Sequence, residues 1–179
     1  MTITISRWLE RSDREHLIDG LDAVFFQSSN TQTFADDATR ATFRERWLGR
    51  YLTHYPEWFY VATAEDGGLA GYLAGCLDDP APRALFADIA HFKTFGHLTR
   101  DYPAHLHVNL RAGYRSAGIG SELVSRFCED ARHAGSPGVH VMTSAQARNV
   151  GFYTRNGFRE LAVSGEGAAA VVFLARPLL

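Results

Sequence analysis

The spacing of apolar residues predicts an alternation of strands and helices along the chain. Apolar or alternating runs bounded by turn residues predict seven strands, at 2–8, 58–65, 69–77, 105–110, 139–144, 158–164 and 169–176. Apolar residues that recur every three or four positions predict helices at 16–28, 36–55, 84–95, 118–134 and 147–156. Ser12 or Asp13 is the expected N-cap of the first helix. Asp36 or Asp37 is expected to start the second helix, and Pro56 ends it.

The order of these elements indicates one mixed sheet. Asp66-Gly67-Gly68 between two apolar runs is typical of a hairpin. The helix at 118–134 connects the strands 105–110 and 139–144, and a crossover helix joins parallel strands. We therefore predict a protein of the α/β class, in its α+β form. Its 179 residues suit a single domain, 1–179.

The composition of the chain limits the kinds of molecule that the protein is expected to bind. The chain is 46% hydrophobic and 21% charged, with a formal net charge of -2. This balance predicts a globular core and argues against broad binding to nucleic acid or a membrane, although a local basic patch stays open. The stretch MTITISRWLERSD lacks the charged and apolar regions of a signal peptide, and no apolar run approaches a membrane span. By default, we expect a cytoplasmic protein.

Cysteine and histidine usage gives little sign of redox or metal chemistry. Cys76 and Cys128 lie in apolar stretches and form no CxxC pair, so we expect two buried, reduced thiols. The apolar interior of a helix also disfavours Cys128 as a thiolate nucleophile. His91, His97 and His105 do not have the spacing of a zinc site. We therefore predict no metal.

The most informative stretch is HLHVNLRAGYRSAGIGSEL, residues 105–123. A strand ends there, a turn contains Arg115, Gly118 and Gly120, and a helix follows. The first N–H groups of a helix have no internal partners and carry the positive end of its dipole. Glycines let a bulky phosphate approach the backbone. The stretch is compatible with a phosphate site, and also with ordinary turn chemistry.

The sequence context argues against a dinucleotide site. Such a site requires the glycine turn after the first strand and an acidic residue about twenty positions later. Here the turn follows the fourth predicted strand, and Asp130 lies ten residues after Gly120 within the same helix. A different phosphate ligand, such as a nucleotide, stays open.

A second motif, NVGFYTRNGF at 149–158, helps to decide between a phosphate site and an ordinary turn. Asn149, Phe152, Tyr153 and Asn156 have i, i+3, i+4, i+7 spacing, so they share one helix face. The glycine that follows is typical of a helix C-terminus. A tyrosine on such a face usually serves packing, and what makes this one informative is its position after the glycine turn and a further strand.

This ordered set resembles the GNAT superfamily of N-acetyltransferases, which transfer an acyl group from coenzyme A to an amine. The resemblance covers residues 58–176 in layout and 105–158 in motif. Arg115, Gly118 and Gly120 match the superfamily's Gln/Arg-x-x-Gly-x-Gly/Ala pyrophosphate loop.

The resemblance implies a GNAT fold, with a mixed central sheet of about seven strands, helices on both faces, and a splayed parallel pair at 105–110 and 139–144. Gln146 stands where the superfamily commonly has an asparagine, so that contact to the cofactor is in doubt. The stretch DYPAHLHVNL is similar to the bacterial relatives of the acetyltransferase-like C-terminal domain of eukaryotic O-GlcNAcase.

The same resemblance implies an acetyl-CoA-dependent N-acetyltransferase, with acetyl-CoA as co-substrate and direct attack by a primary amine in a ternary complex. The residues expected to bind the cofactor are Val108, Leu110, Arg115, Ser116, Ala117, Gly118, Ile119, Gly120, Ser121, Asn149, Phe152 and Tyr153. We expect the Leu110 N–H to polarise the thioester carbonyl, and Tyr153 to donate a hydrogen bond to the departing thiolate.

The group that takes the proton of the amine is open among Asp101, His107 and a chain of water molecules. A histidine suits a base near neutral pH, and the extended Tyr102 before a proline would hold Asp101 at the mouth of the strand. The acceptor, a small molecule or a protein lysine, is expected over the N-terminal helices and residues 78–104. The main alternative is a non-catalytic acyl-CoA-binding or interaction module. A homodimer also stays open.

Overall fold

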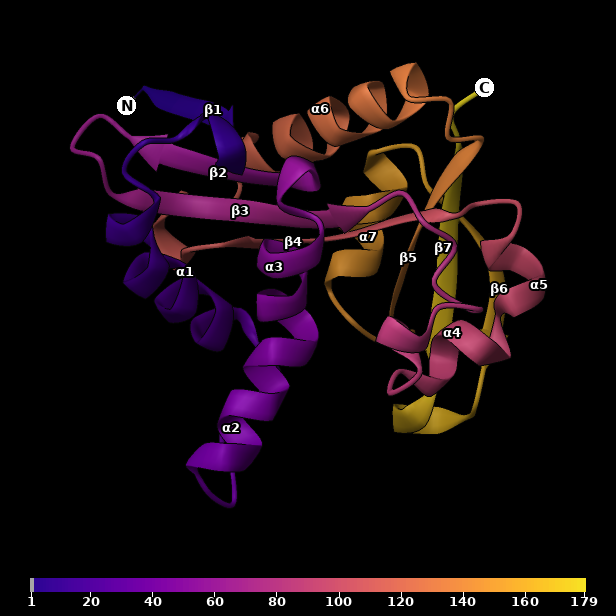
Figure 1. Cartoon of the computed structure of the whole chain (residues 1–179). Helices are drawn as coiled ribbons and strands as arrows, with labels where there is room; N and C mark the ends of the chain where they lie inside the picture. The colour runs from indigo at the N-terminus through magenta and orange to yellow at the C-terminus, as the bar shows by residue number, and fades with distance from the viewer. Residues whose placement is uncertain (1) are drawn as a thin grey trace. The chain divides into compact units, whose positions relative to one another are not determined.

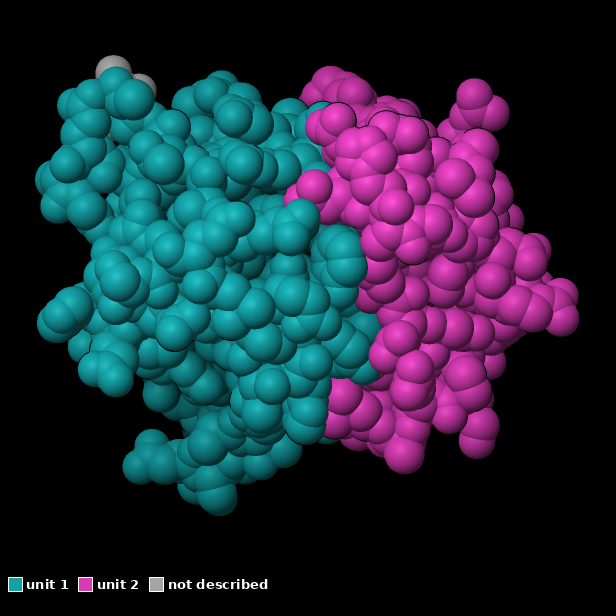
Figure 2. Space-filling view, turned by 45° about the horizontal axis from the view of Figure 1, so that its top comes forward, with its two compact units in different colours: residues 1–76, 107–127 teal, residues 77–106, 128–179 magenta. Residues whose placement is uncertain are grey.

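The computed structural model describes residues 2–179, and these divide into two compact units (Figure 2). Unit 1 holds the chain up to Cys76 together with His107–Phe127, and unit 2 holds Leu77–Leu106 together with Cys128–Leu179. Each unit thus combines two separate stretches of sequence. That residues 1–179 form a single domain stays a prediction.

Unit 1 is an antiparallel sheet with helices on both faces (Figure 1). Its strands are β1 (Ile3–Arg7), β2 (Phe59–Ala64), β3 (Leu69–Cys76) and the end of β4 (Ala104–Leu110). Its helices are α1 (Arg14–Ser28), α2 (Asp37–Arg44), the π turn η2 (Glu45–Gly49), α3 (Arg50–His54), the start of α6 (Ile119–His133), and the short turns η1 (Trp8–Glu10), η3 (Pro56–Trp58) and η5 (Ala112–Tyr114).

Two strands of unit 1, β2 and β3, are buried on both faces. β2 and β3 form the predicted hairpin, in which Gly67 has a φ of 80° and Gly68 C=O accepts from Ala64 N at 2.8 Å. Helices α1 and α3 pack on β3, and the ring of Phe127 from α6 lies against Gly75. A Cβ atom at Gly75 would lie 2.3 Å from that ring, so the close approach of α6 requires a glycine. Burial on both faces explains why these strands are continuous apolar runs without alternation.

The second predicted helix, 36–55, is not continuous. It begins as expected, because Asp36 Oδ1 accepts the Thr39 N–H at 2.7 Å. The π turn Glu45–Gly49 then separates α2 from α3, and apolar spacing alone does not reveal such a turn. The predicted cap of the first helix is also different: Asp13 occupies the N-cap position, but its carboxylate accepts from Arg11 Nε at 2.8 Å and caps no helix N–H.

Unit 2 contains the remaining elements, and β7 is its central strand. They are η4 (Ala84–Phe86), α4 (Ala90–Thr94), α5 (Gly96–Thr99), β5 (Gly138–Ser144), α7 (Asn149–Arg155), β6 (Arg159–Ser164), η6 (Gly167–Ala169) and β7 (Val171–Pro177). Strand β7 pairs antiparallel with both β5 and β6. As predicted, Gly157 ends α7 in a left-handed conformation, with a φ of 85°.

The prediction of a single helix at 84–95 is wrong, because this stretch forms η4 and α4 with a break between them. Its buried residues, Phe86, Ile89, Phe92 and Phe95, recur every three positions. That period is the repeat of a 3-10 helix rather than of an α-helix, so the chain follows a tighter and interrupted path.

The strand order of the sheet is β1-β2-β3-β4-β5-β7-β6. β4 and β5 pair in parallel through Ala104 with Val139 and His105 with His140, at the N-terminal ends of both strands. The predicted mixed sheet of about seven strands with one parallel pair is therefore confirmed for the described residues. That the C-terminal halves of β4 and β5 splay apart stays a prediction.

Candidate active site

The C-terminal end of β4 is fixed in unit 1 by contacts from separate parts of the chain. The carbonyl oxygen of Leu110 accepts hydrogen bonds from Ser28 Oγ at 3.4 Å and from Arg115 Nε at 3.2 Å. The next residue, Arg111, donates its N–H to Ala70 of β3 at 2.9 Å. Val108 and Leu110 are half-buried. The backbone expected to meet the thioester is thus held rigidly and keeps some exposure.

The turn between β4 and α6 contains two residues in the left-handed region. Ser116 has a φ of 64° and Gly118 a φ of 83°, and Gly118 C=O accepts from Glu122 N at 3.1 Å in the first turn of α6. This conformation costs an L-residue about 1–2 kcal/mol, whereas glycine adopts it freely. The predicted turn into a helix is confirmed, but Gly120, which the sequence places in the turn, lies inside α6.

Helix α6 is anchored by one apolar face, and the loop before it is open. The predicted stripe is buried and consists of Leu123, Val124, Phe127, Cys128 and Ala131. Ile119 and Gly120 are also buried, Ser121 is half-buried, and residues 115–118 are exposed. Because the first N–H groups of a helix lack internal partners, an exposed loop before α6 with the cation of Arg115 suits an anion.

Tyr153 lies on α7 in unit 2 and is 4% exposed. Its ring packs edge-on against Phe152 at 5.1 Å and Phe158 at 5.5 Å. The start of α7 is tied to β5, because Thr143 Oγ1 donates to Asn149 Oδ1 at 3.0 Å. The apolar packing fixes the orientation of the tyrosine ring. Gln146, which departs from the motif, is exposed.

The two side-chain candidates for the base differ in environment. Asp101 precedes β4, its side chain is 66% exposed, and Arg100 Nε lies 3.8 Å from its carboxylate. His107 is half-buried on β4, and its Nε2 lies 2.5 Å from the carbonyl oxygen of Trp47. Burial lowers the pKa of His107 to about 4, although the hydrogen bond to Trp47 acts in the opposite direction. His107 is therefore neutral at pH 7 and a weak proton acceptor.

In unit 2, aromatic side chains form a cluster around two histidines, His105 and His140. His105 lies 5.0 Å from the Phe86 ring, 5.1 Å from the Phe92 ring and 5.5 Å from the His140 ring. His140 stacks on Phe173 at 4.7 Å, and its Nδ1 lies 2.5 Å from the Tyr102 carbonyl oxygen. Burial lowers the pKa of His140 to about 4. Residue spacing alone does not predict this pairing, because the two histidines belong to different strands.

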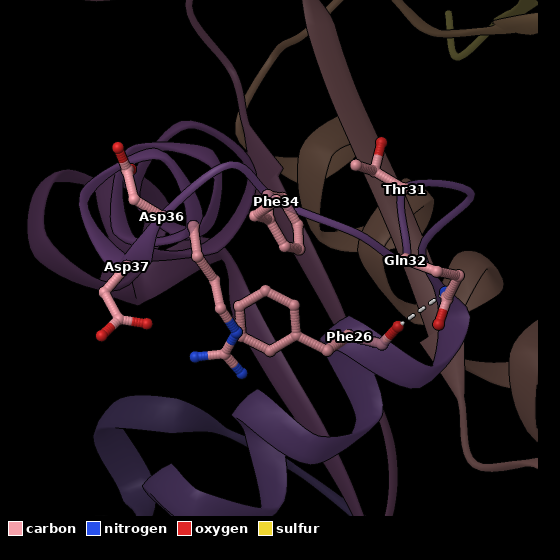
Figure 3. A pocket seen from close by; sticks show the side chains of 7 residues that line it. Phe26, Thr31, Gln32, Phe34, Asp36 and Asp37 are labelled. Atoms are coloured by element: carbon pink, nitrogen blue, oxygen red, sulfur yellow. Dashed lines mark hydrogen bonds between the residues drawn. The ribbon is translucent and has the colours of Figure 1, made fainter.

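A hollow of about 350 Å³ lies in unit 1 between the end of α1 and the start of α2 (Figure 3). It is lined by Phe26, Thr31, Gln32, Phe34, Asp36, Asp37 and Arg40. The rings of Phe26 and Phe34 meet edge to face at 5.9 Å, and the Arg40 guanidinium lies 3.7 Å from the Phe26 ring centroid. Such a surface, with aromatic rings and charges of both signs, suits an amphipathic molecule.

Both cysteines are free and buried, as predicted, and burial raises the pKa of the Cys128 thiol to about 11. In residues 2–179, no group of three His, Cys, Asp or Glu side chains is arranged to hold a metal ion. Within the same range, no helix has the length and apolar character needed to cross a membrane.

The family model described as "Acetyltransferase (GNAT) family" matches residues 25–158. That match includes the loop before α6 and the tyrosine of α7, and it spans most of the chain. The chain belongs to the acetyltransferase (GNAT) family, and its sheet has the strand order and parallel pair of the GNAT fold.

Solved structures share this fold along the whole chain. The crystal structure of SsHAT is 20% identical, with full coverage of both chains and a TM-score of 0.78. An N-acetyltransferase from Staphylococcus aureus is 14% identical, with full coverage of both chains and a TM-score of 0.65. The NatC complex, whose structure was determined with Gag peptide and CoA, is 14% identical with full coverage of both chains and a TM-score of 0.64. At these identities the likeness establishes the fold.

Proposed function

We propose that the protein is an acetyl-CoA-dependent N-acetyltransferase that acetylates a primary amine by direct attack in a ternary complex. The observation that carries the proposal is the left-handed turn at Ser116 and Gly118, which opens α6 in a chain of the GNAT family. The N–H groups of Ile119, Gly120 and Ser121 hold the pyrophosphate, and Arg115 adds a positive charge beside the exposed Ala117. We also propose that the chain is related to the bacterial relatives of the O-GlcNAcase C-terminal domain, because of the stretch DYPAHLHVNL.

The acetyl end of the cofactor extends along the backbone of Val108–Leu110 in this proposal. The fixed Leu110 peptide supports it, because its carbonyl is held by Ser28 and Arg115. An N–H donor that is held in place before the reaction stabilises a developing oxyanion without reorganisation. In unit 2, Asn149 and Phe152 are proposed to meet the cofactor from α7.

The reaction is balanced by one bond formed and one broken. The amine nitrogen attacks the thioester carbon, the C–N bond forms, and the C–S bond breaks to give the coenzyme A thiolate. Tyr153 donates a hydrogen bond to that thiolate. Full proton transfer from a tyrosine of pKa about 10 to a thiolate of pKa about 8.5 is uphill by roughly 2 kcal/mol, so the thiolate takes its proton from the solvent.

Water is the proposed acceptor of the amine's proton. His107 carries a pKa of about 4 and cannot hold a proton that an ammonium group releases near pH 7. Asp101 stays a prediction, and Asp101→Asn tests it through the acidic limb of the pH–rate profile. A retained acidic limb in that variant excludes it as the base.

The carbon skeleton of the acceptor occupies the hollow beside Phe26 and Phe34 in this proposal. The support is a connection within unit 1: Ser28, two residues after Phe26, donates to the Leu110 carbonyl. Asp36 and Asp37 provide negative charge at the same hollow. A basic small molecule or a lysine side chain fits this chemistry. A cytoplasmic location and a homodimer stay predictions.

The proposal is tested by calorimetric titration with coenzyme A and by measuring thiol release from acetyl-CoA with a panel of primary amines. We expect binding and amine-dependent release. A thermal-shift comparison with nucleotides is the control, since a ligand at a hundredfold its dissociation constant stabilises by about 2.7 kcal/mol. Binding without turnover of any amine would favour the non-catalytic module, and stabilisation by nucleotides alone would contradict both.

A further inference from the structure

His107 and Asn109 are polar residues at alternate positions of β4, so they project from the same face of the strand. Both are half-buried. On this face of unit 1 they meet aromatic residues of other elements, Tyr51 of α3 and Tyr72 of β3. Two adjacent polar side chains on a largely apolar sheet require an explanation, because burying polar groups is costly.

The Nε2 atom of His107 already has a hydrogen-bond partner. Its Nε2 lies 2.5 Å from the carbonyl oxygen of Trp47, which belongs to the π turn Glu45–Gly49. Because a carbonyl only accepts, the hydrogen must be on Nε2, and Nδ1 of the neutral ring keeps its lone pair. The ring of Tyr51 stands perpendicular to the imidazole at 4.8 Å and fixes its plane. His107 is thus held as a hydrogen-bond acceptor.

The donor of Asn109 is used in a similar way. Its Nδ2 donates to the hydroxyl of Tyr72 at 2.8 Å. Tyr72 is fully buried and stacks on Phe59 at 5.3 Å, and burial raises its pKa, so the hydroxyl stays protonated. The contact orients the amide and leaves Oδ1 as an acceptor.

We propose that His107 Nδ1 and Asn109 Oδ1 form a two-acceptor clamp that holds two N–H bonds of the incoming primary amine. This inference rests on the proposed function and deepens it. The clamp lies directly before Leu110, the expected oxyanion donor. Holding two N–H bonds leaves the nitrogen lone pair free to attack, and the clamp discriminates against amines with fewer N–H bonds. Removing an acceptor leaves an N–H unsatisfied.

The test compares benzylamine, whose ring suits the Phe26 and Phe34 hollow, with N-methylbenzylamine. The wild-type protein should prefer the primary amine by about tenfold or more in kcat/KM, which corresponds to one hydrogen bond. His107→Leu removes the Nδ1 acceptor together with the contact to the Trp47 carbonyl, and Asn109→Leu removes the second acceptor. In both variants the preference should approach one, while the KM for acetyl-CoA stays unchanged.

Several outcomes would overturn the clamp. If each variant slows both amines equally and keeps the preference, the two residues are structural. A double variant whose loss equals the sum of the single losses would also contradict a shared amine nitrogen. If one variant fails to fold, as judged from its melting temperature, the other variant alone tests the clamp.

The clamp can be separated from the proposed function by a measurement without turnover. Side-chain ¹⁵N resonances of His107 and Asn109 are followed with coenzyme A present while benzylamine is added. The free protein should show a pyridine-like Nδ1, and the amine should shift both side chains. Should no amine be acetylated while these shifts occur, the function fails and the clamp stands as a binding site; absent shifts overturn the clamp.

Discussion

His107 in unit 1 and His140 in unit 2 are held in the same manner and differ in access. Each lies on a strand, each has one ring nitrogen 2.5 Å from a backbone carbonyl, and burial lowers the pKa of each to about 4. His140 is fully buried, stacks on Phe173, and its Nε2 has no hydrogen-bond partner among the described residues. His107 is half-buried beside the polar Asn109.

The difference shows that a lowered pKa does not identify a functional histidine. Both rings are neutral at pH 7, and access distinguishes them. The cluster around His140 is a stabilising core in which aromatic rings replace water. The segment from His107 to Gly118 is half-buried or exposed and keeps polar groups and backbone amides near the surface.

Tyr153 tests the contrast most severely, because it is as buried as the core of unit 2 and is nevertheless proposed to act. Tyr153→Phe keeps the packing against Phe152 and Phe158 and removes only the hydroxyl. We expect turnover to fall about a hundredfold or more, a magnitude typical of general acids. Calorimetry should give an unchanged affinity for acetyl-CoA. Turnover at the wild-type rate would assign Tyr153 to packing alone.

The stability of the protein should fall as the pH decreases from 6.5 towards 4. The pKa of His140 is lowered to about 4 in the folded protein, so the unfolded chain binds the proton first. The contribution of His140 is complete above pH 6.5 and is lost as the pH falls, by about 3 kcal/mol, and His107, whose pKa is lowered to the same value, adds a similar loss. Urea unfolding at pH 7, 6 and 5 measures the slope. His140→Phe should reduce that slope, and an equal slope in both proteins would exclude His140 as its source.

The smallest effect is expected at Cys128. Burial raises the pKa of this thiol to about 11, so little thiolate exists at neutral pH. Cys128→Ala should leave acetyl transfer within about twofold of wild type and cost roughly 1 kcal/mol of stability. Thiol release with the amine panel and urea unfolding provide the two values. A loss of turnover that exceeds the loss of folded protein would give the thiol a chemical role.

Local patterns predicted most of the fold. The hairpin at Asp66-Gly67-Gly68, the buried stripe of α6 and the ending of α7 at Gly157 all follow from turn chemistry and helical spacing, which depend on neighbouring residues. The π turn Glu45–Gly49 did not, because apolar spacing alone does not reveal it, and the break at 84–95 was missed although the three-residue period of its apolar positions is a local signal. Phe86 and Phe92 pack on His105, which belongs to a different element, the strand β4.

The residues of the candidate site were also predicted only in part. The glycine turn and Tyr153 are read from local sequence, and His107 was named as a candidate because of its residue type. Asn109 was missed, although its alternation with His107 was a visible signal. The contact from Trp47 spans 60 positions, and no pattern within one helix or strand indicates it. The role of a buried polar residue depends on such distant partners.

The central claim is that the left-handed turn before α6 binds the diphosphate of coenzyme A. Gly118 and Gly135 have φ values of 83° and 85°, and a Cβ atom at either would meet nothing within 4 Å. Alanine at either position should therefore cost a similar 1–2 kcal/mol of stability, roughly, so Gly135→Ala is the matched control. Calorimetric titration with coenzyme A should show affinity weakened about tenfold or more in Gly118→Ala and unchanged in Gly135→Ala. Equal affinities in the wild type and both variants would contradict the claim.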